Sequence, residues 1–361
     1  MHRHTSITGL TFAGLLAFAA TAAGEGDLRT QAKALFGALP KDMATHPLKP
    51  EQVALGRLLF FEPRVSADGT VSCARCHQPA LYGTDALVKP IGVQHRVNPR
   101  NAPTVLNAAL QISQHWRGDR VSVEDQASQA LTGPASYGNP SQEAAMAKLR
   151  AIPGYRELFA KAFPGQAEPI TAENWGTAIG TYERTLVTPA PFDAWLAGND
   201  GALSPSAQAG LKAFIETGCA SCHNGSGVGG AVYQKFGLAE EYWKATGSRE
   251  IDKGREDVTK APADEYVFKV PSLRNVAMTP PYFHDGSVAA LPQAVQIMAQ
   301  VQLGKTLPDG TVKDIVAFLE SLTGTLPAEF ATEPVLPAAA FEAPQPQPAS
   351  DAGTPAESLQ R

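Results

Sequence analysis

Two pentapeptides decide how this chain folds: Cys73-Ala-Arg-Cys76-His77 and Cys219-Ala-Ser-Cys222-His223. Together they use all four cysteines of the 361-residue sequence. In a c-type haem site, two thiols at this spacing add across the vinyl groups of the porphyrin, and the adjacent histidine binds the iron. A zinc site would not need a histidine after each cysteine pair, and a redox Cys-x-x-Cys usually occurs once. The motifs therefore predict two covalently bound haem c groups, with His77 and His223 as iron ligands.

The N-terminus predicts export. A short basic start precedes the uncharged, apolar residues 7–20, and Ala20 and Ala22 then form an A-x-A arrangement. We expect residues 1–23 to be a signal peptide, cleaved after Ala22 or Ala23. A membrane anchor is the alternative, but the apolar run is short and small side chains follow it. In a bacterium the mature protein is then expected in the periplasm, and not as an integral membrane protein.

Composition and charge limit the class of partner. The chain is 43% hydrophobic, which is enough to build a core, and 18% charged. Its formal net charge is −5, and no long basic run is present. Because phosphate binding needs clustered Lys and Arg, nucleic acid is not an expected partner.

The two haem motifs divide the chain into similar halves, since their histidines are 146 residues apart. A stretch of helical periodicity precedes each motif, at residues 54–60 and at residues 209–215. Further helices are expected from residue 171 to residue 186 and over residues 311–322, and no long alternating strand is apparent. These patterns predict a mainly α fold.

The expected architecture is two cytochrome c-like haem domains packed together. Residues 24–190 form the N-terminal domain and residues 191–327 form the C-terminal domain. Residues 328–361 are rich in Pro, Ala, Glu and Gln, which cannot bury enough apolar surface to become ordered. We therefore expect a flexible C-terminal tail.

The sixth ligand of each iron decides what each haem does. A Met or His ligand occupies the sixth coordination position, whereas an open position lets the iron react with a substrate. For any single methionine, core packing is the simpler interpretation. Sequence spacing does not choose among the available residues: His46, His95, His115, His284, Met43, Met146, Met278 and Met298.

Several longer segments resemble the bacterial dihaem cytochrome c peroxidases, and the resemblance covers residues 45–325. The family also includes protein-modifying relatives such as MauG, so the resemblance alone leaves the reaction open. The segments are ALGRLLFFEPR at 54–64, RNAPTVLN at 100–107, DEYVFKVPSLRNVA at 264–277 and PYFHDG at 281–286.

The resemblance implies a division of labour between the haems. The haem on His77 would react with peroxide, and the haem on His223 would receive electrons with Met298 as its sixth ligand. Met298 lies fourteen residues after His284, as the family spacing requires. A thioether favours reduced iron, which suits an electron acceptor, and MauG has a tyrosine there instead. Trp116 stands where the family keeps a tryptophan between the haems, which implies an electron relay; core packing is the simpler alternative.

The resemblance also implies a calcium ion between the domains. Its ligands would be the side chain of Asn101 and the backbone carbonyls of Thr279 and Pro281, completed by water. A distal histidine is implied for the N-terminal haem. The family position corresponds to Val93, and the nearest histidine is His95, which we take as the candidate ligand. If it does not ligate, the iron is permanently open.

One departure concerns the acid/base residue. Peroxide cleavage needs a group that takes a proton from H₂O₂ and delivers it to the departing oxygen. The family uses a Glu in a Pro-x-Glu-Met-Gly stretch, but residues 134–138 read PASYG, which places Ser136 there. Gln126, the matching distal amide, is retained. Several nearby groups could substitute for the carboxylate: Glu124, Asp125, Glu143, His95 and His115.

Three functions stay open from the sequence. The predicted one is a periplasmic peroxidase that reduces H₂O₂ to water with electrons from a small cytochrome c or cupredoxin. The second is a MauG-like oxidase of a partner protein or small molecule, which Met298 disfavours. The third is a dihaem electron-transfer or redox-sensing protein with weak peroxidase activity, which Ser136 favours. A homodimer is expected from the family.

Overall fold

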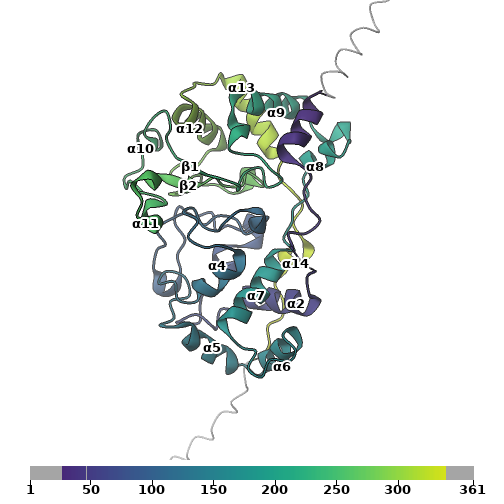
Figure 1. The fold of residues 1–361 in the computed structure, drawn as a ribbon, viewed down its shortest axis with the longest axis vertical. Helices are drawn as coiled ribbons and strands as arrows, with labels where there is room; N and C mark the ends of the chain where they lie inside the picture. The colour runs from purple at the N-terminus through teal and green to yellow at the C-terminus, as the bar shows by residue number, and fades with distance from the viewer. Residues whose placement is uncertain (1–26, 46, 339–361) are drawn as a thin grey trace, which may run out of the picture.

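The computed structural model describes residues 27–45 and 47–338 (Figure 1). The predicted signal peptide, residues 1–23, lies outside the described residues, as do His46 and residues 339–361. Helices dominate, and the strands found in the described ranges, β1 (Tyr233–Lys235) and β2 (Val267–Lys269), pair antiparallel with Gln234 opposite Phe268. The prediction of a mainly α fold is confirmed. Within the same ranges, no helix combines the length and apolar character needed to cross a membrane.

The helices form two groups, one above the other in Figure 1, and each group has its own buried core. The lower group contains α2 (Pro50–Phe60), α4 (Val123–Ala130), α5 (Gln142–Arg150), α6 (Pro153–Ala162) and α7 (Ala172–Glu183). The upper group contains α8 (Pro191–Leu196), α9 (Pro205–Thr217), α10 (Tyr242–Thr246), α11 (Glu256–Thr259), α12 (Leu291–Leu303) and α13 (Asp309–Glu320).

One helix crossing occurs in both halves. A Cβ on Gly56 of α2 would overlap a carbonyl oxygen of α7, and a Cβ on Gly210 of α9 would overlap one of α13. Glycine therefore permits the close approach of the two backbones in each half. The predicted helices at 54–60 and 209–215 lie inside α2 and α9, which confirms them. Gly218 ends α9 with φ 110°, directly before Cys219.

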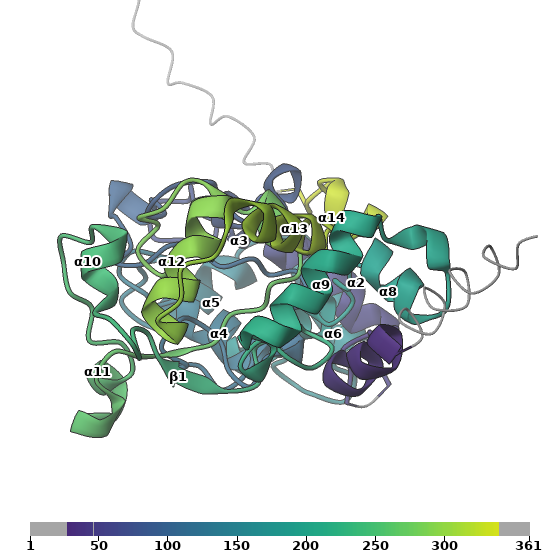
Figure 2. The same cartoon turned by 90° about the horizontal axis from the view of Figure 1, so that it is seen from above.

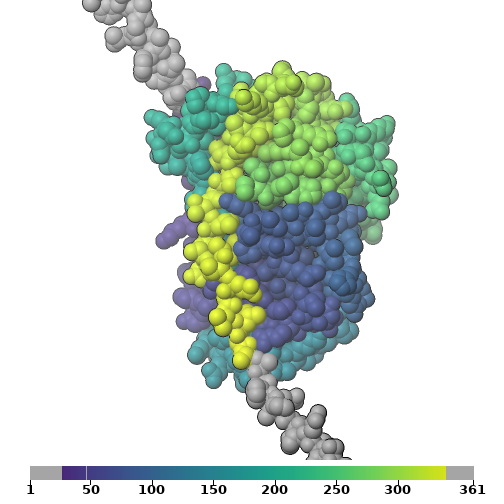
Figure 3. All heavy atoms as spheres, turned by 180° about the vertical axis from the view of Figure 1, so that it is seen from behind, coloured from purple at the N-terminus to yellow at the C-terminus, as the bar shows by residue number. Residues whose placement is uncertain are grey.

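The two ends of the described chain are exchanged between the halves. The helical segment 27–36 lies beside α8 and α9 (Figure 2), where Phe36 packs edge-on against Phe192 of the upper core. Residues 328–338 instead run along the lower half (Figure 3), and begin with α14 (Ala328–Ala331). The domain boundaries predicted from the sequence, 24–190 and 191–327, did not include this exchange. It depends on contacts between residues far apart in the chain, which no local sequence pattern indicates.

The first part of the expected tail is packed, which corrects the prediction that flexibility begins at residue 328. Phe330 is fully buried against Phe60 in the lower core. The Arg57 guanidinium donates to the carbonyl oxygens of Glu329 and Thr332, and Arg64 donates to that of Pro337 at 2.9 Å. One large aromatic side chain and hydrogen bonds to backbone carbonyls thus order the first part of a segment that is rich in Ala and Pro.

A loop and helix after each haem motif repeat with a constant offset of 168 residues. Asn107 and Asn275 have left-handed φ values of 58° and 62°, and each precedes a 3-10 turn, η3 (Ala108–Leu110) and η7 (Val276–Met278). Their side-chain amides both donate to the hydroxyl of Thr188, at 2.7 and 3.0 Å. The buried Thr188 is therefore shared by the two halves.

The same offset continues through the next turn. His115 and Phe283 have φ values of 64° and 70°, and Gly118 and Gly286 have values of 65° and 63°. Isolated antiparallel bridges, Gln114 with Arg120 and Tyr282 with Val288, close the two turns. Five residues after each glycine, α4 and α12 begin. Equivalent backbone positions in the two sites can therefore be compared residue by residue.

Candidate functional site

The first motif forms the single turn α3 (Cys73–Cys76) in the lower half. Nδ1 of His77 lies 3.0 Å from the carbonyl oxygen of Gly83, which orients the ring and leaves Nε2 as the coordinating atom. Burial lowers the pKa of His77, and the Gly83 carbonyl opposes this effect. The imidazole is thus held as a neutral ligand.

The second motif follows α9 and shares with the first a glycine of positive φ. Gly229 lies six residues after His223, as Gly83 does after His77, and both glycines have positive φ, 115° and 74°. A Cβ on Gly229 would overlap the carbonyl oxygen of Pro271, so only glycine fits. Burial lowers the pKa of His223 to about 4, although the Pro271 carbonyl opposes this. All four cysteines of the chain lie in described residues, and none forms a disulfide.

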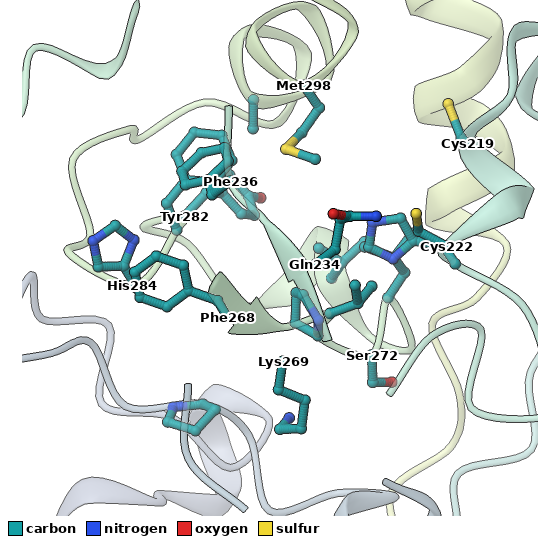
Figure 4. Close-up of a pocket in the computed structure, with 18 of the residues that line it drawn as sticks. Cys219, Cys222, Gln234, Phe236, Phe268, Lys269, Ser272, Tyr282, His284 and Met298 are labelled. Carbon is teal, nitrogen blue, oxygen red and sulfur yellow. The ribbon is translucent and has the colours of Figure 1, made fainter. Parts of the chain in front are cut away.

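A cavity of about 360 Å³ lies over the second motif and reaches the junction of the halves. Cys219, Cys222 and His223 form one wall, and Met298 of α12 forms another. Figure 4 shows the sulfur of Met298 turned into the space. Apolar side chains complete much of the lining: Phe236, Phe268, Leu291, Val295 and Leu319. An apolar cavity with two thiols, a neutral imidazole and a thioether fits a covalently bound haem with His and Met ligands.

Of the other residues considered as sixth ligands, His115 and His284 also line this cavity, whereas the remaining methionines of the described residues do not. Met43 and Met146 are buried in the lower half, and Met278 is 44% exposed. The ring of His284 stacks on Phe268, with ring centroids 4.4 Å apart (Figure 4). Of the methionines in the described residues, Met298 is the one that lines the cavity of a haem motif.

The segment that contains Ser136 lies beside the first motif. Tyr137 places its hydroxyl 3.4 Å from Sγ of Cys73, and Ser136 is the preceding residue. The segment is held by a second loop, since the backbone N–H of Val93 donates to the Ser136 carbonyl at 3.2 Å and Asn98 donates to the Ala135 carbonyl at 2.6 Å. Ser136 itself is half-buried.

His95 and Gln126 occupy different surroundings. His95 belongs to the loop that holds the Ser136 segment, and its side chain is exposed. Gln126 is half-buried on α4, the helix that packs against α7. The histidine whose charge acts on His77 is His115, which lowers the pKa of that ring.

Trp116 lies where the two halves meet. Its indole N–H donates to the carbonyl of Asn101 at 3.0 Å, and its own carbonyl accepts from the backbone N–H of Lys269 in β2 at 2.8 Å. The predicted calcium ligands, Asn101, Thr279 and Pro281, line the same cavity as Trp116. The Asn101 amide N–H donates to the Leu87 carbonyl at 2.8 Å, which leaves its side-chain oxygen as the atom for a ligand. The described residues contain no cluster of three or more His, Cys, Asp or Glu suited to a metal.

Lys269 and Glu183 are among the buried ionisable residues that were not singled out from the sequence. Lys269 is 5% exposed and lines the cavity, donates to the side-chain oxygen of Gln111, and has no carboxylate partner among the described residues. Burial lowers the pKa of Lys269 to about 8. Burial and the nearby Glu124 raise the pKa of Glu183 to about 8. A charged residue inside an apolar stretch, such as Val267-Phe268-Lys269-Val270, is the signal that could have found the lysine.

Comparison with known proteins shows the family of this chain. The family model of the di-haem cytochrome c peroxidases matches residues 50–201. The chain is 42% identical to the cytochrome c551 peroxidase of Pseudomonas aeruginosa, over 92% of this chain and 96% of that protein. It is 40% identical to that of Nitrosomonas europaea, over 84% and 89%, and 37% identical to MauG of Methylorubrum extorquens, over 77% and 79%.

Among solved structures, a MauG-like protein associated with microbial copper homeostasis has a TM-score of 0.71 at 26% identity, and covers 82% of this chain and 97% of that one. The diheme peroxidase BthA of Burkholderia thailandensis shares the fold, with a TM-score of 0.63 at 21% identity over 81% of this chain and 92% of that one. The identities over most of the chain show a common family. The protein belongs to the di-haem cytochrome c peroxidase family and is a haem peroxidase.

Proposed function

We propose that this chain is a periplasmic cytochrome c peroxidase, which reduces H₂O₂ to water with electrons from a small cytochrome c or cupredoxin. One observation carries the proposal, namely the difference between the two sites at the position of Met298. Met298 faces the cavity of the second site, and the offset of 168 residues makes Ala130 of α4 its counterpart in the first half. Because an alanine side chain has no ligand atom, the first iron is left open on that side.

The chain contributes distinct residues to the two haems. Cys73, Cys76 and His77 would hold one haem, and Cys219, Cys222, His223 and Met298 would hold the other. A haem iron with an open position supplies the chemistry that cleaves the O–O bond. The thioether of Met298 favours reduced iron, which suits the site where electrons enter. Trp116, which contacts both halves, is the proposed relay between the sites.

The distal side of the first site is the least typical part of the proposal. Gln126 would position peroxide through its side-chain amide. Ser136 stands where the family has a carboxylate, and a hydroxyl does not act as a base near neutral pH. His95 would have to turn inward with its loop to become a ligand, because its side chain is exposed. We therefore propose a first haem that is open without reductive activation.

Calcium is a further part of the proposal. Asn101, Thr279 and Pro281 offer neutral oxygens on the wall of one cavity, and a hard cation bound through such oxygens keeps several waters. The expected homodimer also stays a prediction.

The test uses the holoprotein with both haems attached. We expect ferric protein to show one high-spin haem and one low-spin His/Met haem by electron paramagnetic resonance. Addition of H₂O₂ should oxidise a reduced small cytochrome c at two electrons per peroxide. If both haems stay low-spin in the ferric and half-reduced states and no turnover occurs, the electron-transfer or redox-sensing function replaces this proposal. Oxidation of a partner protein without cytochrome turnover would favour the MauG-like function, against which Met298 counts.

A further inference from the structure

The three carboxylates that the sequence offered as substitutes for the missing one are already engaged. Glu124 forms a two-pronged ion pair with Arg184, at 2.7 and 3.1 Å. The side chain of Asp125 accepts from the backbone N–H of Val121 at 2.9 Å, and Glu143 pairs with Arg150. A carboxylate held in this way is a poor proton carrier, because taking up a proton would cost it the ion pair or hydrogen bond that it makes with its partner. The missing carboxylate at Ser136 is therefore not replaced by these acids.

The internal repeat shows on which side of the first site His115 lies. Its counterpart in the second half is Phe283, which packs on the same buried cluster as Met298. Phe283 thus lies on the sixth-ligand side of the second site. By the same geometry, His115 lies on the sixth-ligand side of the first site, together with Ala130. His115 is also near enough to the first motif for its charge to lower the pKa of His77.

A carboxylate stands behind the imidazole. Nδ1 of His115 lies 3.3 Å from Oδ1 of Asp119, and this oxygen is buried without a hydrogen-bond partner. Burial alone would raise the pKa of Asp119, but contact with His115 and the charges of Arg117 and Arg120 hold it below its ordinary value. A carboxylate beside Nδ1 keeps the proton on that nitrogen and leaves Nε2 free to accept another.

The pair is particular to the first half. The residue equivalent to Asp119 in the second half is Ser287, next to Phe283 and Gly286 in the same turn. The left-handed backbone at His115 and Phe283 is a property of the shared turn, whereas the side chains differ. The His115 side chain is 39% exposed, so a molecule as small as H₂O₂ can reach it.

We propose that His115 is the acid/base group for peroxide cleavage in this chain, and that Asp119 is its positioning residue. This inference rests on the peroxidase function proposed above. Nε2 of His115 takes the proton from the peroxide oxygen that faces the iron and delivers it to the other oxygen. The O–O bond breaks as that oxygen leaves as water. Two electrons from the cytochrome or cupredoxin donor and two protons from solvent convert the remaining oxygen to a second water.

The test compares His115→Phe with the double variant His115→Phe/Ser136→Glu in the holoprotein. Phenylalanine is the residue that the equivalent turn already accommodates. We expect His115→Phe to slow the reaction with H₂O₂ by about 10²–10⁴-fold, as loss of a general acid/base does. The double variant should regain at least about tenfold, because Glu restores a carboxylate where the family has one. A fold defect could not be rescued by this second change.

Binding of cyanide gives a readout besides turnover. Hydrogen cyanide must lose its proton on binding to ferric iron, so a base beside the open position speeds association. We expect cyanide association to slow by about tenfold or more in His115→Phe, and by less in Asp119→Asn. Gln129→Ala, an exposed position on α4, serves as the matched control and should leave both rates unchanged.

The outcomes separate this inference from the proposed function. If wild-type protein turns over H₂O₂ and His115→Phe reacts with peroxide and cyanide at the wild-type rate, His115 has no such role and the peroxidase function stands. If Glu183→Gln shows the loss instead, the buried Glu183 is the acid/base group. Absence of turnover in the wild-type protein, together with cyanide association that does not depend on His115, overturns both.

Discussion

The lower and upper halves of the molecule use one backbone plan to make two unlike haem sites. In both, a glycine-dependent helix crossing leads to the haem motif, and a left-handed turn then leads into a helix. The side chains at equivalent positions differ: Ala130 replaces Met298, and His115 replaces Phe283. In the function proposed above, the first pair decides whether the iron has a sixth protein ligand, and the second decides whether a base faces it. Division of labour thus needs few side-chain changes and no change of fold.

The most severe test of this comparison gives the first half the ligand of the second. Ala130→Met should place a thioether on the open side of the first iron, convert that haem to low spin, and slow its reaction with H₂O₂ by about 10³-fold, or about 4 kcal/mol of barrier. Electron paramagnetic resonance and stopped-flow measurements check both effects.

Ala130→Leu is the matched control, because leucine adds similar volume without a ligand atom. It should leave the haem high-spin. If the reaction with H₂O₂ slowed equally in both variants, steric blocking and not coordination would be responsible.

The exchange of chain ends predicts a difference in stability between the halves. Phe330→Ala should lower the free energy of unfolding by about 3 kcal/mol, because it removes a fully buried ring from the lower core. The loss of stability should be confined to the lower half, so the His77 haem should become exposed at a lower denaturant concentration than in the wild-type protein. Val335→Ala, at a 95% exposed position in the same segment, should change the stability little. A similar effect of both substitutions would contradict a specific anchoring role for Phe330.

A milder change removes the sixth ligand from the second site. Met298→Leu should lower the reduction potential of that haem and reduce cytochrome-dependent turnover by about 100-fold, since the thioether no longer favours reduced iron. The direct reaction of peroxide with the first haem should be retained. Redox titration and stopped-flow measurements separate the two effects, with Met278→Leu as the exposed control. Unchanged turnover would exclude Met298 from the electron path.

The smallest expected effect concerns the buried charge between the halves. Lys269→Met should lower the reduction potential of the second haem by about 60 mV, a tenfold change in the one-electron equilibrium, because a nearby positive charge favours reduced iron. Burial has lowered the pKa of Lys269 to about 8, so the wild-type lysine is charged below this pH and neutral above it.

The wild-type potential should accordingly fall as the pH rises through about 8, and this fall should be absent in Lys269→Met. Lys253→Met, which changes an exposed lysine, is the control. A potential that falls equally in both variants would assign the titration to another group.

The sequence predicted the features whose cause is local. The haem motifs contain their own chemistry, and α9 carries a side-chain cap at Ser204, Pro205 in its first turn and Gly218 at its end. The packing of Phe330 was not predicted, because its partners lie far away in the chain and its neighbours suggest disorder. The equivalence of His115 and Phe283 was also hidden, since it lies in shared backbone angles and not in shared residues.

The exchange of chain ends determines the order in which the two cores can form during synthesis. The ribosome makes residues 50–186 long before Phe330, so the lower core lacks one of its buried rings until after the upper half has been made. The upper half has its N-terminal helix from the start and needs nothing beyond residue 322 for its main core. The lower half is therefore the last to complete its core. A chain that stops before Phe330 has an incomplete lower core, while the upper half already has all of its core residues.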